Sequence, residues 1–225
     1  MSTGGLCITF DDKSVADWVA VAPMLAKYEA RATFYISQFH TFTSKELNQL
    51  RVLEAYGHEI GYHTVNHPRL ENYLEQFDLK HYIVNEIERG LEMMSKLGFK
   101  TESFAYPFNN ATQDSIQLLS SYFKTQRISS ESIEGALTEK TGNYLLRGKS
   151  IDLHADSTTF RSRTADDVVA EIKIAAERDK VAVVYAHRVT HELTNQTKIT
   201  PMGLEYVIHH AKALNLNFYT ASELA

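Results

Sequence analysis

Two adjacent carboxylates end the first apolar segment of this sequence, which makes them candidates for metal binding or acid–base chemistry. Asp11 and Asp12 follow directly on residues 6–10. An acidic pair before a helix is often only a solvated turn that interacts favourably with the helix dipole. At the end of a buried strand, however, such charges are costly unless a cation compensates them. Because successive side chains of a strand point to opposite sides, one aspartate can bind a cation while its neighbour faces another part of the pocket.

Two histidine pairs occur at a spacing of four, His63/His67 and His187/His191, so the spacing alone says little. The first pair is more informative because it follows a predicted strand and is closed by Pro68, which disfavours helix at the residue before it. One turn after the strand would bring both imidazoles to the same side. Taken alone, the pair is compatible with metal ligands and with ordinary loop histidines. We interpret His191 as a solvated loop residue.

Asp12, His63 and His67 together form a three-ligand set with an open position, as in catalytic zinc sites. Zinc lowers the pKa of a water molecule in such a position to about 7. Asp11 lies next to that position and could accept the proton of the water as a general base. These residue types in this order predict a metal-dependent hydrolase.

His187 ends the most continuous apolar run of the chain, residues 181–186, which predicts a strand buried on both faces. In parallel α/β folds the ligand site lies at the carboxyl ends of the strands. This rule places His187 in the same pocket as the other candidates, where it could protonate the leaving group as a general acid. The alternative is a core histidine bonded to a backbone carbonyl.

Short apolar segments alternate with helical patterns along the chain, which predicts an α/β fold. The predicted strands are 6–10, 32–36, 59–63, 103–106, 144–151, 181–186 and 216–220. The predicted helices, with apolar residues spaced by three and four, are 14–28, 44–56, 81–97, 112–122, 165–178 and 201–214. About seven parallel strands with right-handed crossovers favour a closed or nearly closed barrel. A doubly wound open sheet alternates in the same way and stays an alternative.

The composition narrows the possible function classes. We expect a single domain over residues 1–225, because 44% of the residues are hydrophobic and no linker or repeat interrupts the chain. With a net charge of −5 and no basic run, we expect no nucleic-acid partner. No stretch approaches the roughly 18 apolar residues of a membrane span. Cys7 is the single cysteine, which excludes an intrachain disulfide.

The location of the protein in the cell is not predicted. Residues 1–5 do not resemble a signal peptide, so a cytosolic protein and a secreted or cell-envelope protein whose signal was removed are both possible. The oligomeric state is not predicted.

Four segments of the chain match one family in order and separation. They are Thr-Phe-Asp-Asp at 9–12, His-Thr-Val-Asn-His at 63–67, Phe-Ala-Tyr-Pro-Phe at 104–108 and Val-Tyr-Ala-His at 184–187. Together they resemble the polysaccharide deacetylases of carbohydrate esterase family four, the NodB homology domain. The resemblance implies a distorted (β/α) barrel and hydrolysis of N-acetyl, sometimes O-acetyl, groups on a glycan. It also implies one divalent metal, usually zinc.

The resemblance assigns roles by motif position. Asp11 resembles the family's base, Asp12, His63 and His67 resemble its metal ligands, and His187 resembles its acid. The remaining motif implies a substrate-binding segment at Tyr106, Pro107 and Phe108, whose backbone N–H near Phe108 resembles the donor to the developing oxyanion.

Two positions depart from the family pattern. Lys13 stands where glycine is common, and it could narrow the pocket mouth or meet an anionic glycan. Ala105 stands where many members carry an arginine that pairs with the base. We expect Arg147 to supply that cation from the neighbouring strand and therefore to bond Asp11, although an ordinary surface arginine is an equal alternative.

Other functions remain compatible with the sequence. They are a glycan-binding protein of the same fold with impaired catalysis, an amidohydrolase of small non-carbohydrate amides, and a two-histidine-one-carboxylate iron oxygenase, which the α/β pattern disfavours. The glycan is not identified, and peptidoglycan, chitin-like oligomers, a secreted N-acetylglucosamine polymer and acetylated xylan are all possible. Five aromatic residues are candidates for stacking on a sugar, or else belong to the core: Trp18, Tyr35, Tyr62, Tyr106 and Phe108.

Overall fold

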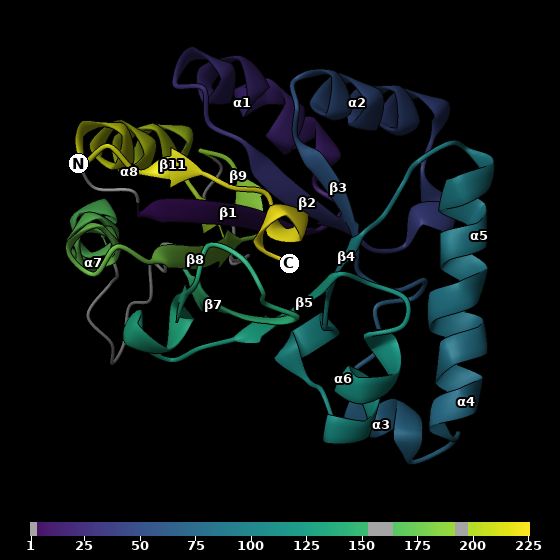
Figure 1. Ribbon diagram of the computed structural model, residues 1–225. Coiled ribbons are helices and arrows are strands. Elements are labelled where there is room, and N and C mark those ends of the chain that lie inside the picture. Colours follow the sequence, from purple (N-terminus) through teal and green to yellow (C-terminus); the bar gives the residue numbers. More distant parts are fainter. Residues whose placement is uncertain (1–3, 153–163, 192–197) are drawn as a thin grey trace, which may run out of the picture.

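Seven parallel strands form a closed barrel at the centre of the computed structural model (Figure 1). The structure describes residues 4–152, 164–191 and 198–225. Neighbouring strands follow one another around the barrel, and β8 pairs with β1 to close it. In this order the strands are β1 (Gly5–Asp12), β2 (Ala32–Ile36), β3 (Glu59–Tyr62), β4 (Ser103–Ala105), β5 (Thr125–Ser129), β7 (Leu145–Ser150) and β8 (Val181–Ala186).

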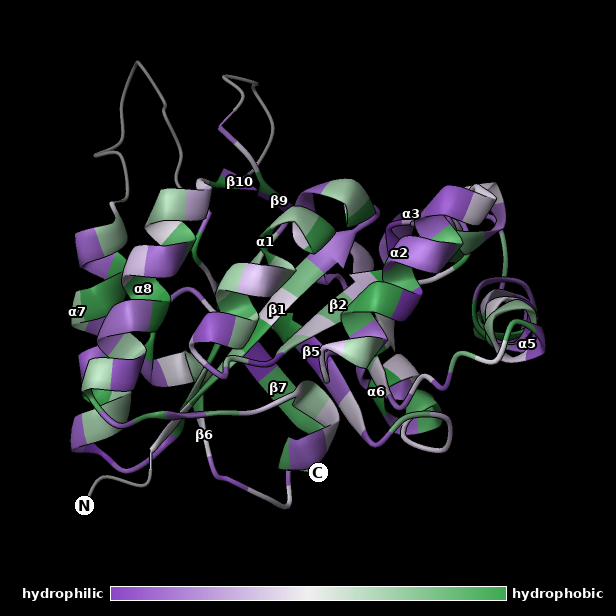
Figure 2. Ribbon diagram, turned by 90° about the horizontal axis from the view of Figure 1, so that it is seen from above, coloured by the Kyte–Doolittle hydropathy of each residue, from purple (hydrophilic) through white to green (hydrophobic). Residues whose placement is uncertain are grey.

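Helices surround the barrel on its outer side. They are α1 (Val15–Lys27), α2 (Ser44–Ala55), α3 (Leu70–Leu74), α4 (Leu79–Tyr82), α5 (Arg89–Lys96), α6 (Gln113–Leu119), α7 (Ala165–Glu177) and α8 (Pro201–Ala213). The π-helical segment η2 (Ile83–Glu88) joins α4 to α5 in one long helix on the right of Figure 1. The outer helices alternate hydrophilic and hydrophobic residues (Figure 2), as expected of helices that bury one face against the barrel.

The predicted barrel is confirmed, but one of its strands was assigned wrongly from the sequence. β5 was not predicted, because Gln126 and Arg127 are polar residues within a short buried strand and hide its apolar pattern. The predicted strand 216–220 contains β11 (Asn217–Phe218), which pairs with the first two residues of β1 and is not one of the seven barrel strands. Among the described residues, three further short strands lie outside the barrel: β6 (Leu137–Thr138), β9 (Arg188–Val189) and β10 (Lys198–Ile199).

Two hydrophobic clusters stabilise the barrel. The larger one lies between the strands and the helices, where Phe10, Trp18 and Phe34 pack their rings together. The smaller one fills the inside and includes Cys7 and Tyr35, with Leu224 of the C-terminal 3-10 helix η5 (Ala221–Leu224). η5 covers the amino ends of the strands, so the carboxyl ends are left for a site.

Short 3-10 segments complete the connections: η1 (Phe39–Thr41), η3 (Pro107–Asn109) and η4 (Glu134–Ala136). Within the described parts of the chain, no helix is long and apolar enough to cross a membrane.

Candidate active site

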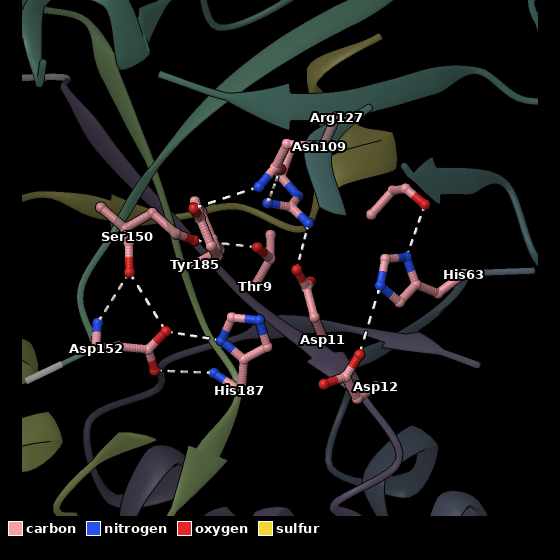
Figure 3. A network of polar contacts seen from close by, with 12 residues as sticks. Thr9, Asp11, Asp12, His63, Asn109, Arg127, Ser150, Asp152, Tyr185 and His187 are labelled. Carbon is pink, nitrogen blue, oxygen red and sulfur yellow. Dashed lines mark hydrogen bonds and ion pairs between the residues drawn. The ribbon is translucent and has the colours of Figure 1, made fainter. Parts of the chain in front are cut away.

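The predicted acidic and histidine residues meet at the carboxyl ends of the barrel strands (Figure 3). Asp11 and Asp12 end β1, His63 directly follows β3, and His187 directly follows β8. β1 lies between β2 and β8, so the aspartates stand between the two groups of histidines. Asp11 points toward the arginine of β5, whereas Asp12 points toward His63 (Figure 3). Residues more than 170 positions apart in the sequence thereby share one pocket.

The three expected metal ligands present their donor atoms to a common point. One ligand atom from each of Asp12, His63 and His67 lies within 4.8 Å of the others. The Asp12 Oδ1 atom is 3.6 Å from His63 Nε2 and 3.2 Å from His67 Nε2, and the two Nε2 atoms are 3.1 Å apart. A tetrahedral ion with bonds of about 2.1 Å would separate its ligands by about 3.4 Å. The donor set therefore fits a single small divalent ion.

The protonation states of these ligands also suit a cation. His63 Nδ1 lies 2.7 Å from the carbonyl oxygen of Ala105, which fixes the proton on Nδ1 and leaves the Nε2 lone pair free. Burial lowers the pKa of His63 to about 4, so its ring is neutral at neutral pH. Burial raises the pKa of Asp12, but the hydrogen bond from His67 and the charges of the nearby histidines outweigh it and lower the pKa to about 2.

Asp11 is held by an arginine that the sequence analysis did not identify. Arg127 on β5 is completely buried, and its Nη2 donates to Asp11 Oδ2 at 2.5 Å. Its guanidinium lies 4.5 Å from the ring centre of Tyr185 and 5.5 Å from that of Tyr35. Gly148 leaves room for it, because a Cβ there would be 3.2 Å from Arg127 Cδ. Asp11 Oδ1 is buried and has no hydrogen-bond partner among the described residues, so it is available to a substrate water.

The prediction for Arg147 is wrong. β5 and β7 pair in parallel with Arg127 opposite Leu146 and Ile128 opposite Arg147. Side chains alternate along each strand, so Arg127 and Leu146 point into the barrel whereas Arg147 points out and is exposed. The cation beside Asp11 is therefore Arg127 of β5, the strand next to β4. It replaces the arginine that many family members carry at the position of Ala105.

His187 has its own carboxylate partner, Asp152, which the sequence analysis also missed. Asp152 Oδ2 lies 2.7 Å from His187 Nδ1, and Asp152 Oδ1 accepts the backbone N–H of His187 at 3.1 Å. Burial alone lowers the pKa of His187, but the bond to Asp152 and the nearby carboxylates Asp11 and Asp12 outweigh it and raise the pKa to about 9. His187 is therefore protonated at neutral pH. The only sequence signal for Asp152 is its place just after the strand of Ser150.

The segment expected to bind substrate is largely part of the core. Tyr106 is fully buried and its hydroxyl donates to Gln126 Oε1 at 2.8 Å, and Pro107 is also buried, so the expectation of substrate contacts by these two side chains is wrong. Phe108 is 55% exposed, and its ring centre lies 4.7 Å from that of His67. Phe108 and Asn109 both have φ 54, a left-handed conformation that is strained outside glycine and clusters at functional sites.

Of the five aromatic candidates for sugar stacking, only Phe108 is open to solvent, since Trp18, Tyr35 and Tyr62 are also completely buried. A cavity of about 380 Å³ opens beside the metal ligands. It is lined by Asp12, Lys13, Ser14, Ser37, Gln38, His67, His187 and Arg188. Lys13 therefore lies at the cavity, in the position where the sequence departs from the family pattern.

Solved structures share this fold. A carbohydrate esterase of family four from Streptococcus mutans aligns with a TM-score of 0.68 and 20% identity over 97% of this chain and 86% of its own. The catalytic domain of a peptidoglycan N-acetylglucosamine deacetylase from Eubacterium rectale aligns with a TM-score of 0.60 and 14% identity over 98% and 90%. A pseudoenzyme of the esterase family, in a mutant form with restored activity, aligns with a TM-score of 0.63 and 13% identity over 99% and 68%.

At these identities the structural matches establish the fold alone. No curated protein sequence matches the chain. Residues 2–125 match the sequence pattern of the family described as polysaccharide deacetylase. This segment carries β1 to β4 with Asp11, Asp12, His63 and His67, and it is more than half of the 225 residues. The chain belongs to the polysaccharide deacetylase family.

Proposed function

We propose that this protein is a metal-dependent hydrolase that removes N-acetyl groups from a glycan. The observation that carries the proposal is the convergence of the Asp12, His63 and His67 donor atoms beside a buried carboxylate and opposite a protonated histidine. Family membership supports a deacetylase, and the raised pKa of His187 supports its role as the proton donor. Zinc is the divalent ion that best suits two imidazoles and one carboxylate in a tetrahedral set.

In the proposed reaction Asp11 is the base and His187 is the acid. A divalent ion at the three ligands would supply Lewis acidity to the acetyl carbonyl and to the attacking water. Asp11 Oδ1 takes a proton from the water as its oxygen bonds to the carbonyl carbon, while Arg127 keeps Oδ2 turned away. His187 then gives a proton to the amide nitrogen, the C–N bond breaks, and acetate and a free amine leave. A backbone N–H near Phe108 is proposed as an oxyanion donor.

The state of His187 supports amide rather than ester hydrolysis. An amine is a poor leaving group unless its nitrogen is protonated during bond cleavage. A histidine whose pKa is raised to about 9 keeps that proton available throughout the neutral range. O-acetyl esters remain a second substrate class, because the same attack on the carbonyl would cleave them.

The main alternative is a glycan-binding protein with impaired catalysis, since a pseudoenzyme shares this fold. Two departures from the family pattern, at Lys13 and Ala105, permit this alternative. Arg127 of β5 replaces the arginine missing at Ala105, at 2.5 Å from the base, which favours catalysis. Because the positively charged Lys13 lines the cavity, an acidic glycan is a possible substrate.

The test is acetate release from N-acetylated and O-acetylated oligosaccharides, including chitin-like oligomers, peptidoglycan fragments and acetylated xylan. Activity should be lost with chelator and restored by Zn²⁺. Asp11→Asn and His187→Ala should retain metal but lose roughly 10²–10⁴-fold in kcat. Near-normal turnover in either variant would show that the replaced residue does not have the proposed acid or base role. Release of acetate from small amides but from no glycan would instead support the amidohydrolase.

A further inference from the structure

The long helix beside the barrel contains a buried carboxylate that the proposed chemistry does not use. Glu86 is 2% exposed and lies in η2, the π-helical segment between α4 and α5. π-helical turns are rare and are frequently found at functional sites. A buried carboxylate is costly unless it is hydrogen-bonded. Both features indicate that Glu86 has a specific task.

Glu86 bonds the turn that carries the two histidine ligands. Its Oε2 accepts the backbone N–H of Asn66 at 2.8 Å, and its Oε1 accepts Asn66 Nδ2 at 2.7 Å. The same residue accepts a third bond through its backbone carbonyl, from the hydroxyl of Tyr62 at 2.5 Å. Tyr62 directly precedes His63, and Asn66 directly precedes His67. One residue of the helix therefore holds the chain next to both ligands.

The helix is shaped to allow this contact. A Cβ at Gly90 would lie 1.8 Å from the hydroxyl oxygen of Tyr62, so only glycine admits the tyrosine against the helix. The Glu86 carbonyl accepts the Tyr62 hydroxyl at this point of close approach.

The turn needs external support because its backbone is strained. Thr64 has φ 69 and His67 has φ 59, left-handed conformations that residues other than glycine adopt at a cost. Inside the turn, His67 N–H donates to Thr64 Oγ1 at 3.0 Å. The bonds to Glu86 fix the turn from outside.

His67 depends on this support more than His63 does. Metal-binding histidines usually donate their second ring nitrogen to a fixed acceptor, which orients the ring. His63 has such an acceptor in Ala105, whereas no bond from a described residue reaches Nδ1 of His67. The orientation of His67 therefore comes from its backbone, and hence from Asn66 and Glu86.

We propose that Glu86 is a positioning residue for the metal site, which holds the 63–67 turn in the geometry that lets His67 bind the ion. The inference rests on the proposed metal site and extends it to a second layer of residues. Loss of the contact should weaken metal binding rather than substrate binding. Outer partners of metal ligands typically contribute about 10–100-fold in affinity.

The test compares Glu86→Gln with Glu88→Gln. Glu88 is an exposed carboxylate of the same helix that accepts the hydroxyl of Tyr122 at 2.7 Å, so it is a matched control away from the turn. In Glu86→Gln one amide oxygen can serve only one of the two Asn66 donors well. The dissociation constants for Zn²⁺ and Co²⁺, measured by competition with a chromophoric chelator, should rise about 10–100-fold in Glu86→Gln and stay unchanged in Glu88→Gln.

Two further readouts separate positioning from general instability. The visible absorption of the Co²⁺ form should change in Glu86→Gln, and saturating metal should restore kcat with KM for the glycan unchanged. Asn66→Ala removes the exposed partner and should show a smaller loss of metal affinity even if Glu86→Gln does not fold. Unchanged metal affinity in a folded Glu86→Gln or in Asn66→Ala would overturn the inference. Wild-type protein that binds no divalent ion would instead overturn the proposed function.

Discussion

The metal half and the acid–base half of this site are held together in different ways. The metal half takes two of its three ligands from one turn, His63 and His67, which the helix stabilises from outside through Glu86. The acid–base half consists of two pairs: Arg127 of β5 bonds Asp11 of β1, and Asp152, just after β7, bonds His187, just after β8. Both carboxylates of these pairs are nearly completely buried.

Because of this difference, substitutions in the two halves should change different properties of the protein. In the metal half the ligands are close in sequence, so a change there should alter metal binding while the barrel stays intact. In the acid–base half Arg127, Asp11 and Asp152 are buried, so removing the partner of one of them leaves a buried charge without compensation. A change there should affect stability or pH dependence as well as catalysis.

The largest expected effect is the loss of a ligand in the metal half. His63→Ala should abolish Zn²⁺ binding and glycan deacetylation, because it removes one of three donor atoms. Circular dichroism should show a folded protein, and metal content and acetate release should fall to background. His191→Ala is the control from the second histidine pair, and it should retain both. Full metal content in His63→Ala would break the proposed ligand set.

Next comes the buried ion pair of the acid–base half. Arg127→Met should lower the free energy of unfolding by about 3–5 kcal/mol, since it leaves the buried Asp11 carboxyl without its ion-pair partner. For a chain of this length the melting temperature should fall by roughly 6–20 °C. Thermal and urea unfolding measure this loss. A variant as stable as wild type would show that Asp11 does not depend on Arg127.

A smaller and more specific effect is expected at the second pair. Asp152→Asn removes the negative charge, and with it the charge-assisted hydrogen bond, that raises the pKa of His187 to about 9. The general acid must be protonated, so the alkaline limb of the kcat profile should move to lower pH. A pH–rate series with Zn²⁺ at saturation measures this shift. An unmoved limb would mean that another group sets it.

The Asp152–His187 pair should also make the free energy of unfolding depend on pH. The folded pKa of His187 is raised above its ordinary value of 6.5. Its contribution to stability is therefore full below about pH 6.5 and is lost as the pH rises through about 9. In Asp152→Asn the difference in unfolding free energy from wild type should shrink across that interval.

The smallest expected effect is at Arg147. Because this side chain points out of the barrel, Arg147→Ala should change kcat only slightly and the free energy of unfolding by no more than about 0.5 kcal/mol. It is the matched control for Arg127→Met, one strand away. A large loss of activity would return the positioning role to Arg147.

Features that depend on residues close together in the chain could be predicted from the sequence. Apolar spacing predicted most of the strands and all the helices except the short α3, because amphipathic periodicity depends only on residues close in sequence. The short motifs at 9–12 and 63–67 identified the metal ligands as candidates, because both lie at predicted strand ends. The same periodicity failed for β5, whose buried positions include the polar Gln126 and Arg127.

Which charged residues from distant parts of the sequence form pairs could be seen only in the folded structure. Arg127 and Arg147 lie on adjacent strands, and the register of β5 against β7 sends the first into the barrel and the second to the surface. A change of register by one residue would exchange the faces, and nothing in either segment fixes that register alone. Asp152 and Glu86 likewise acquire their roles from partners 35 and 20 residues away. Such pairings depend on packing across the whole barrel, which local sequence patterns do not encode.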